Sequence, residues 1–152
     1  MDSEAIQSMD LSSLKAVIKD LRSKIVPSRF EKAQQPESHS IQLGLRTLNK
    51  LIWIEFSWQA LAPRVVQVES PPRIGSTSTL AKQIQHGIEG LALIELSQKG
   101  FERIVEFKFA KRPGGDIHKF LILEIMGKRS NFFLLDNKRK VITIGKQIKE
   151  KQ

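Results

Sequence analysis

Two short apolar runs, separated by a polar insert, constrain the fold more than any other feature of this chain. The runs cover residues 120–126 and 132–135, and the insert covers residues 127–131. Each run is too short for a buried helix and is rich in the residue types that suit a pleated surface. The sequence therefore predicts two adjacent antiparallel strands joined by a tight hairpin.

The insert itself, Gly-Lys-Arg-Ser-Asn, has the chemistry of a chain reversal. Gly127 can adopt a positive φ, and Ser130 and Asn131 can bond to nearby backbone groups and so close the turn. These three residues are expected to shape the hairpin rather than to contact a ligand. Lys128 and Arg129 are then expected at its tip, where positive charge is offered to a partner.

The rest of the chain predicts two helices and further strands. Apolar residues recur at three- and four-residue steps from Leu11 to Ile25, with Asp10 as a candidate N-cap and Pro27 after the end. Ser78 or Thr79 is expected to cap a second helix over residues 80–88, ended by Gly87 and Gly90. Strands are expected over residues 29–35, 41–47, 51–58, 64–68, 91–97, 102–110, 117–126, 132–135 and 141–144, with a hairpin turn at 111–116.

This order of elements predicts an α+β domain, a two-layer β-sandwich of about eight mostly antiparallel strands flanked by two helices. With 152 residues the chain is long enough for one domain with a sizeable core. The expected organisation is a flexible N-terminus over 1–9, the folded domain over 10–145, and a polar tail over 146–152.

Several functional classes find no support in the composition. There is no cysteine, so disulfides and thiolate metal sites are excluded. The apolar runs are shorter than the roughly 20 residues that cross a bilayer, so no membrane contact is expected. The three histidines have no ligand-like spacing, and no nucleophile elbow or phosphate-binding glycine loop is present. We expect no enzyme, no cofactor, no metal and no small-molecule substrate.

The aromatic residues are expected to pack rather than to bind. Phe132 and Phe133 could stack on bases, but neighbours in a strand face opposite ways, so at least one of them is a core residue, and we expect both to be. Trp53 and Trp58 lie in or beside an amphipathic strand, where packing is the commoner role.

The positive charge lies mainly in the last third of the chain. The net charge is +9, and residues 99–152 hold 14 lysines and arginines against 6 acids. The basic clusters are residues 111–112, 128–129 and 138–140, each at an expected turn. Basic turns can simply solvate hairpin ends and protect edge strands. Three of them along one meander favour a surface for nucleic acid, gathered on a single side.

Four stretches resemble one known family. Residues 124–131, Glu-Ile-Met-Gly-Lys-Arg-Ser-Asn, followed by apolar residues and Asp136, are similar to the Glu-Leu-Met-Gly-(Arg/Lys)-x-Ser-Asn pattern of the NFACT N-terminal domain. That family is also called the fibronectin-binding protein A N-terminal domain. Asp10 matches an early family aspartate, residues 41–47 resemble a family strand, and residues 100–105 resemble Gly-x-Asp-Arg-(Ile/Val)-(Ile/Val), with Glu102 in place of aspartate.

The resemblance implies more than the residues themselves do. NFACT proteins act in ribosome quality control: they bind obstructed large ribosomal subunits, recruit tRNA and support untemplated C-terminal tailing. The resemblance implies tRNA as the partner, together with the large ribosomal subunit in a full-length protein. Its early Asp and its Asp-Arg pair are associated with tRNA contact. The candidate RNA-binding residues are Asp10, Glu102, Arg103, Lys128, Arg129, Lys138 and Arg139.

Other interpretations remain open at this level. Asp10 could be a plain helix cap, and Glu102 with Arg103 a solvated pair. The family domain resembles the N-terminal domain of formamidopyrimidine-type DNA glycosylases, but the N-terminal proline nucleophile of those enzymes is absent here. A catalytically dead nucleic-acid-binding domain, or a protein-binding adhesion module, are the alternatives. The compartment is expected to be cytoplasmic or organellar, with a plastid possible if a leader has been removed.

Overall fold

The computed structural model describes residues 9–75 and 77–147. Most of the expected flexible N-terminus (residues 1–8) and most of the expected polar tail (residues 148–152) lie outside the described residues. The helices are α1 (Leu11–Ile25) and α2 (Thr79–Ile88), with a short 3₁₀ turn, η2 (Gly127–Arg129). The strands are β1 (Ser28–Gln34), β2 (Ser40–Arg46), β3 (Leu51–Ser57), β4 (Arg64–Val68), β5 (Ala92–Gln98), β6 (Ile104–Ala110), β7 (Ile117–Glu124), β8 (Asn131–Asp136) and β9 (Val141–Ile144).

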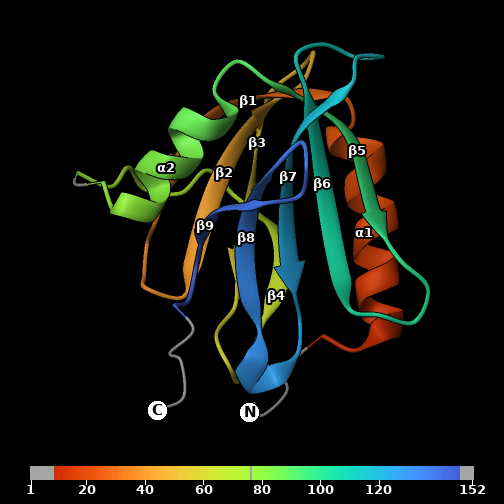
Figure 1. Cartoon of the computed structure of the whole chain (residues 1–152), viewed down its shortest axis with the longest axis vertical. Helices are drawn as coiled ribbons and strands as arrows, with labels where there is room; N and C mark the ends of the chain where they lie inside the picture. Colours follow the sequence, from red (N-terminus) through yellow and green to blue (C-terminus); the bar gives the residue numbers. More distant parts are fainter. Residues whose placement is uncertain (1–8, 76, 148–152) are drawn as a thin grey trace.

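The strands form one sheet with the order β4-β3-β2-β1-β5-β6-β7-β8-β9, and every pair of neighbours is antiparallel. The predicted α+β class is confirmed, and the described part of the chain has nine strands. The two layers of the expected sandwich are halves of this single sheet, which curls so that β3 packs against β8 across the core (Figure 1).

Aromatic side chains hold the two halves together across the core. The ring of Phe56 on β3 lies 4.8 Å from that of Phe107 on β6 and 5.1 Å from that of Phe132 on β8, centroid to centroid. Trp58 stacks on Phe132 at 5.3 Å. Gly145 packs against Trp58 so closely that a Cβ would lie 2.8 Å from the indole. The prediction that Phe132 and Trp58 pack in the core is confirmed, since both are buried. The same prediction for Phe133 is wrong, because this residue is half-buried against a smaller cluster outside the main core.

The two helices cover opposite flanks of the curled sheet (Figure 1). In α1, the apolar stripe of Leu14, Ile18, Leu21 and Ile25 is fully buried in the main core. Ser78 caps α2, accepting from the Ala81 N–H at 3.0 Å. The predicted end of this helix at about Ile88 is confirmed, with Gly90 just beyond it, but Gly87 does not terminate the helix. Gly87 lies inside α2, where an added Cβ would lie 2.6 Å from Leu134, so helix and sheet approach closely there.

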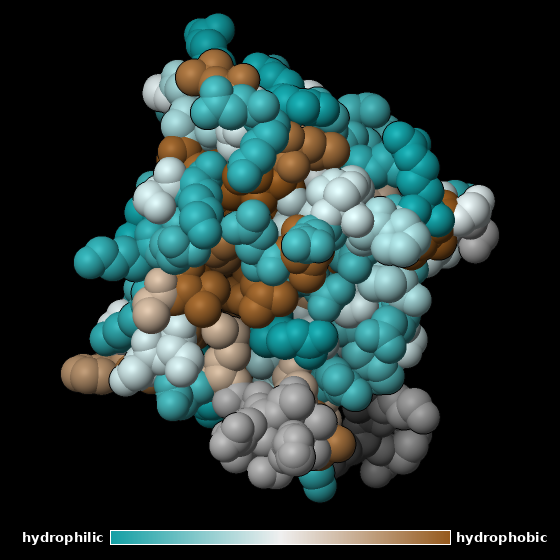
Figure 2. Space-filling model, turned by 180° about the vertical axis from the view of Figure 1, so that it is seen from behind, coloured by the Kyte–Doolittle hydropathy of each residue, from teal (hydrophilic) through white to brown (hydrophobic). Residues whose placement is uncertain are grey.

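The back of the molecule is mostly hydrophilic, with apolar residues gathered towards its centre (Figure 2). A second, smaller apolar cluster lies apart from the main core and comprises Phe120, Ile122 and Leu135, with Ile104, Ile117 and Phe133 against it. Its members alternate with the core residues of β7 and β8, so they occupy the outer face of these strands. Among the described residues, no helix is long and apolar enough to cross a membrane.

Candidate nucleic-acid interface

Successive turns of the β5–β9 meander lie at alternate ends of the strands, because each strand reverses the direction of the last. We call one end, with the β5–β6 turn, the β7–β8 hairpin and the start of α1, the Arg103 end (Figure 1). The opposite end, with the β6–β7 and β8–β9 turns, is the Lys138 end. Strands of seven residues place the two ends roughly 20 Å apart.

The basic clusters are divided between these two ends. Lys128 and Arg129 lie at the Arg103 end, whereas Lys111, Arg112 and the cluster at 138–140 lie at the Lys138 end. The expectation that all three clusters share one surface beside Arg103 is therefore wrong. A meander cannot place consecutive turns on the same side, and Lys138 and Arg139 lie a strand's length away from the other candidates.

Arg103 lies next to the start of α1, close to Asp10, although the two residues are 93 positions apart in the sequence. The half-buried Arg103 donates from Nη1 to the Met9 carbonyl at 3.0 Å, immediately before α1. Asp10 caps α1, its Oδ1 accepting from the Ser13 N–H at 2.7 Å. That hydrogen bond, with a smaller contribution from the Arg103 charge, lowers the pKa of Asp10. The cap prediction is confirmed, and the structure brings the two family positions together.

The turn before Arg103 presents an aromatic side chain that sequence reasoning passed over. Phe101 is 90% exposed, and the Lys15 ammonium of α1 lies 5.6 Å from its ring centroid. Glu102 is exposed as well, and no hydrogen bond or ion pair of its carboxylate involves the described residues. The sequence did contain a signal for this residue, because Phe101 lies in a turn, within the same motif as Arg103.

Backbone contacts of two motif residues fix the β7–β8 hairpin. Gly127 has a φ of +56°, as predicted, and starts η2. The Ser130 hydroxyl accepts from the Met126 N–H at 2.8 Å, which closes the turn. The buried Asn131 side chain accepts from the N–H groups of Phe132 and Lys146, both at 2.8 Å, and donates to the Lys146 carbonyl at 2.9 Å. The shaping role predicted for these residues is confirmed.

A cavity of about 540 Å³ opens beside this hairpin. The apolar side chains of Met126 and Phe133 line it, as does the carboxyl of Glu124. Glu124 is half-buried, and burial raises the pKa of its carboxyl. Its side chain makes no hydrogen bond or ion pair within the described residues. Three cations also line the cavity: Lys128, Arg129 and Lys146.

Three charged side chains at the Lys138 end, those of Asp136, Arg139 and Glu106, bind groups of the protein itself. The Asp136 carboxylate accepts from the N–H groups of Lys138 at 2.8 Å and Lys140 at 2.9 Å, and these bonds lower its pKa. Arg139, at a φ of 65°, donates from Nη2 to the buried carboxylate of Glu106 at 2.7 Å. Its guanidinium lies 4.5 Å from the Phe120 ring centroid. Arg139 is thus committed to contacts within the protein, whereas Lys138 is exposed.

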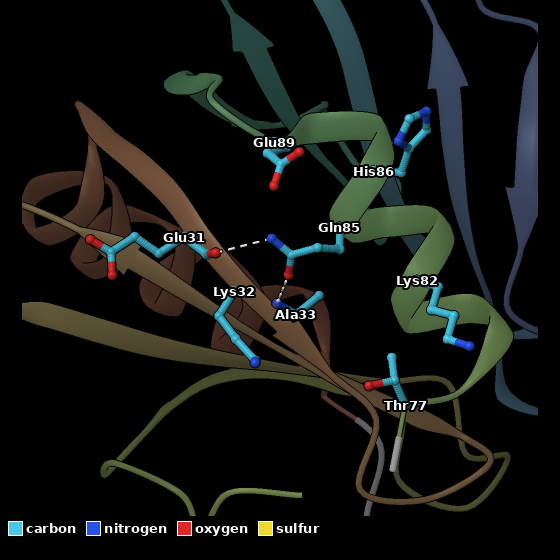
Figure 3. A pocket seen from close by; sticks show the side chains of 8 residues that line it. All are labelled: Glu31, Lys32, Ala33, Thr77, Lys82, Gln85, His86 and Glu89. Atoms are coloured by element: carbon cyan, nitrogen blue, oxygen red, sulfur yellow. Dashed lines mark hydrogen bonds between the residues drawn. The ribbon is translucent and has the colours of Figure 1, made fainter. Parts of the chain in front are cut away.

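A second cavity, of about 560 Å³, lies between β1 and α2 (Figure 3). β1 pairs with β5 only at Ser28 and Arg29. Beyond these two residues the strands separate, and the Gln85 side chain bonds to the backbone of β1 in place of β5. Gln85 accepts from the Ala33 N–H at 2.8 Å and donates to the Glu31 carbonyl at 3.1 Å. The polar lining is therefore explained by the gap between the strands.

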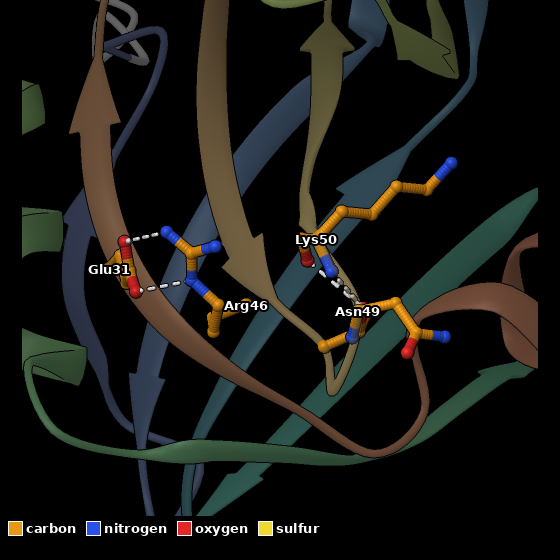
Figure 4. A network of polar contacts seen from close by, with 5 residues as sticks. Glu31, Arg46, Asn49 and Lys50 are labelled. Atoms are coloured by element: carbon orange, nitrogen blue, oxygen red, sulfur yellow. Dashed lines mark hydrogen bonds and ion pairs between the residues drawn. The ribbon is translucent and has the colours of Figure 1, made fainter.

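The most complete surface ion pair lies on β1 and β2, where Arg46 shares a shallow pocket with Pro113 of the β6–β7 turn (Figure 4). Arg46 binds Glu31 through Nε at 2.8 Å and Nη2 at 3.3 Å, and this pair lowers the pKa of Glu31 and raises that of Arg46. Nearby, the Thr47 hydroxyl bonds to backbone groups of Asn49 and Lys50 and closes the β2–β3 turn. These charges are mutually satisfied and bring no free group to a ligand. Within residues 9–75 and 77–147, no cluster of three or more His, Asp or Glu side chains could hold a metal ion.

Comparison with known proteins agrees with the motif at the Arg103 end. The family model described as "NFACT N-terminal and middle domains" matches residues 10–152. "Rqc2 homolog RqcH" from Streptococcus suis is 29% identical over 135 residues, which is 85% of this chain and 24% of that protein. The RqcH homolog of Bacillus subtilis is 27% identical over 129 residues, 83% of this chain and 23% of that protein. The chain thus spans about a quarter of the length of these relatives.

Solved structures give the same result for the fold. The N-terminal domain of fibronectin-binding protein PavA from Streptococcus pneumoniae has a TM-score of 0.82 at 26% identity, covering 91% of this chain and 54% of that one. The N-terminal part of the fibronectin/fibrinogen-binding protein of Streptococcus suis has a TM-score of 0.81 at 27% identity, covering 91% and 53%. The family match over residues 10–152, with the fold that accompanies it, establishes that this chain belongs to the NFACT family.

Proposed function

We propose that this chain is the tRNA-contacting domain of a ribosome-associated quality control factor. In the full-length protein it would help to rescue obstructed large ribosomal subunits and to support untemplated tailing of the stalled chain. The observation that carries the proposal is the hydrogen bond from Arg103 to the Met9 carbonyl, next to Asp10, together with the bond that the Arg103 carbonyl accepts from the Ile125 N–H at the start of the β7–β8 hairpin. Family membership and the names of the RqcH relatives support the same function.

The Arg103 end supplies the chemistry that RNA requires. Arg103 keeps donors beyond the one bound to Met9, since a guanidinium carries five N–H groups and can grip phosphate or a base edge. Asp10 and the exposed Glu102 can accept from ribose hydroxyls or base amino groups. Lys128 and Arg129 are exposed cations at a rigid tip, suited to phosphate. Phe101 adds an exposed ring on which a base can stack.

The Lys138 end is assigned a secondary role. Lys138 would contact phosphate of an RNA long enough to span the two ends, without contributing to recognition. Arg139 would contribute less, because its guanidinium is held by Glu106 and lies over Phe120. Substitutions at the two ends should therefore have different effects on tRNA affinity.

Titration of labelled tRNA by fluorescence anisotropy at several salt concentrations tests the proposal. We expect Arg103→Ala to weaken tRNA binding about tenfold, the order of one lost charge-assisted bidentate contact. Lys128→Ala with Arg129→Ala should lower the salt slope by about 1.5, the sum for two neutralised phosphates.

The matched control removes the same charge at the other end, as Lys138→Ala with Lys140→Ala. It should change tRNA affinity much less, and by a similar factor for duplex DNA. Equal losses from both double variants, or undiminished binding by a folded Arg103→Ala, would contradict the proposed placement. No salt-dependent tRNA binding by the unmodified chain would contradict the function itself.

A protein-binding adhesion module is the second candidate, because structures similar to this one are named as fibronectin- or fibrinogen-binding proteins. The surface supports it less well. Leu48, Leu61 and Phe101 are strongly exposed but belong to three different turns, and single exposed apolar residues are ordinary on soluble proteins. Binding to immobilised fibronectin that is insensitive to salt, without tRNA binding, would favour this alternative.

A further inference from the structure

The cavity beside the β7–β8 hairpin is lined by apolar and acidic side chains as well as by cations. Phosphate binding needs positive charge and N–H donors, yet this cavity also holds two apolar side chains, Met126 and Phe133, and one carboxyl, that of Glu124. Glu124 lies opposite Asn131 in the β7–β8 ladder, and Phe133 lies one step further along the same outer face. An apolar wall beside a carboxylate, ringed by cations, matches the three parts of a nucleotide: base face, base edge and phosphate.

We propose that this cavity binds one unpaired RNA base that carries an amino group on its Watson–Crick edge, with guanine the preferred base. The base face would lie against Phe133 and Met126, and the Glu124 carboxylate would accept from the base edge. Guanine offers adjacent N1–H and N2–H donors to the two carboxylate oxygens. Cytosine and adenine offer a single amino group, whereas uracil presents one N–H between two carbonyl oxygens that the carboxylate repels. This inference rests on the proposed RNA-binding function.

Three observations support the assignment. The cavity is built rather than incidental, because the three bonds of the Asn131 side chain and the Ser130 hydroxyl fix its rim. Glu124 is half-buried without a partner among the described residues, so its acceptors are free for a ligand. Lys128 and Arg129 are exposed beside the same space, where the phosphates on either side of a bound base would lie, and the Lys146 ammonium, held by the Lys128 carbonyl, adds charge to its rim.

The volume is compatible with the ligand as well. A space of about 540 Å³ falls within the ordinary range for small-molecule sites and is open to solvent on one side. Phe133 is half-buried on the outer face of the sheet and can present part of its ring without leaving its packing against the smaller apolar cluster. Single-stranded RNA can place one base there while its backbone follows the hairpin.

The test uses uridine hexamers in which one central position is guanosine, cytidine, adenosine or uridine, titrated against the full 152-residue chain. We expect the guanosine hexamer to bind at least about fivefold more tightly than the all-uridine hexamer, as for one good bidentate base contact. Equal affinity for all four hexamers, or no binding of any at millimolar protein, overturns the inference.

Glu124→Gln is the decisive variant. The amide has one acceptor and one donor, which suit the N3–H and carbonyl of uracil, so the preference for guanosine should fall to about twofold or less. Glu37→Gln removes the same charge from the exposed β1–β2 turn and should leave the preference unchanged. A Glu124→Gln protein that keeps the full preference overturns the inference.

Met126→Ala provides a second route that leaves Glu124 in place. Met126 is 42% exposed, so its truncation should be tolerated by the fold, and it should weaken all four hexamers by a similar factor of about three. Unchanged affinities contradict the apolar wall. A parallel tRNA titration distinguishes failure of this inference from failure of the proposed function. If tRNA binding depends on Arg103 but the hexamers show no base preference, the base-binding cavity is contradicted and the proposed function is not.

Discussion

Both ends of the β5–β9 meander carry a basic cluster, but their acidic side chains are engaged differently. At the Lys138 end, Asp136 binds two backbone N–H groups and Glu106 binds Arg139, so these two acids are used within the protein, whereas the exposed Asp116 makes no such contact within the described residues. At the Arg103 end, Glu102 and Glu124 make no such contacts within the described residues. A basic cluster alone therefore does not define a ligand site: only at the Arg103 end does a half-buried carboxyl, that of Glu124, line a cavity together with cations and lack a partner among the described residues.

The structural role of the acidic and amide side chains at each end can be tested by measuring the free energy of unfolding of variants. Asn131→Ala should have the largest effect, because it removes three hydrogen bonds of a buried side chain. It leaves the backbone of Phe132 and Lys146 unpaired. We expect a loss of roughly 3 kcal/mol in the free energy of unfolding, measured with urea.

Asp136→Ala is the matched change at the other end, where two N–H partners lose their acceptor in an exposed turn. Water can replace the carboxylate there, so the loss should be clearly smaller. Equal losses would show that the two turns are fixed to the same degree and would weaken the comparison.

The next effect concerns Arg139, which the sequence suggested as an RNA contact. Arg139→Met should destabilise the fold by about 2 kcal/mol, because it leaves the buried Glu106 carboxylate without its only charged partner among the described residues. Its effect on tRNA affinity should be small. The measurement is urea unfolding alongside tRNA titration.

The double variant Arg139→Met with Glu106→Met is the control. Removing both partners takes away the unpaired charge, so most of the lost stability should return. A stable Arg139→Met protein with weakened tRNA binding would instead place Arg139 in the RNA interface and would reverse the roles of the two ends.

Local rules predicted much of this molecule. The caps at Asp10 and Ser78, the positive φ of Gly127 and the backbone contacts of Ser130 and Asn131 follow from short-range chemistry, and all are observed. The strand pattern was predicted to within a few residues for the same reason. Each of these features depends on interactions between residues that are close together in the sequence, so the sequence alone is enough to predict them.

Features that depend on long-range geometry were missed. Nothing local indicates that the sheet curls until Phe56 meets Phe132, or that Gln85 replaces a strand beside β1. The solvent exposure of Glu124 depends on a hairpin and on the segment after β9, which Asn131 holds in place. The division of the basic clusters between two ends, in contrast, follows from the antiparallel meander that the sequence already predicted.

The smallest expected effect concerns the pH dependence of stability at Glu124. Burial raises the pKa of this carboxyl above its value in the unfolded chain, so the folded state binds the proton more tightly. The ionised form therefore lowers stability at pH values above the folded pKa, and the penalty disappears as the pH falls below the unfolded pKa. Glu124→Gln should then raise the free energy of unfolding by about 0.5 kcal/mol near neutral pH, a modest amount for a half-buried group.

Urea unfolding at about pH 7 and about pH 3.5 measures this difference, since an ordinary glutamate titrates between them. The gain from Glu124→Gln should vanish at the lower pH. The opposite sign is expected for Asp10→Asn, because the pKa of Asp10 is lowered in the fold and its ionised form stabilises α1 at neutral pH. Two acids at one end of the molecule thus respond oppositely to pH: one holds the fold together, and the other weakens it slightly while keeping an acceptor free. A stability gain from Glu124→Gln that persisted at the lower pH would point to a cause other than the buried charge and would remove this sign of a ligand site.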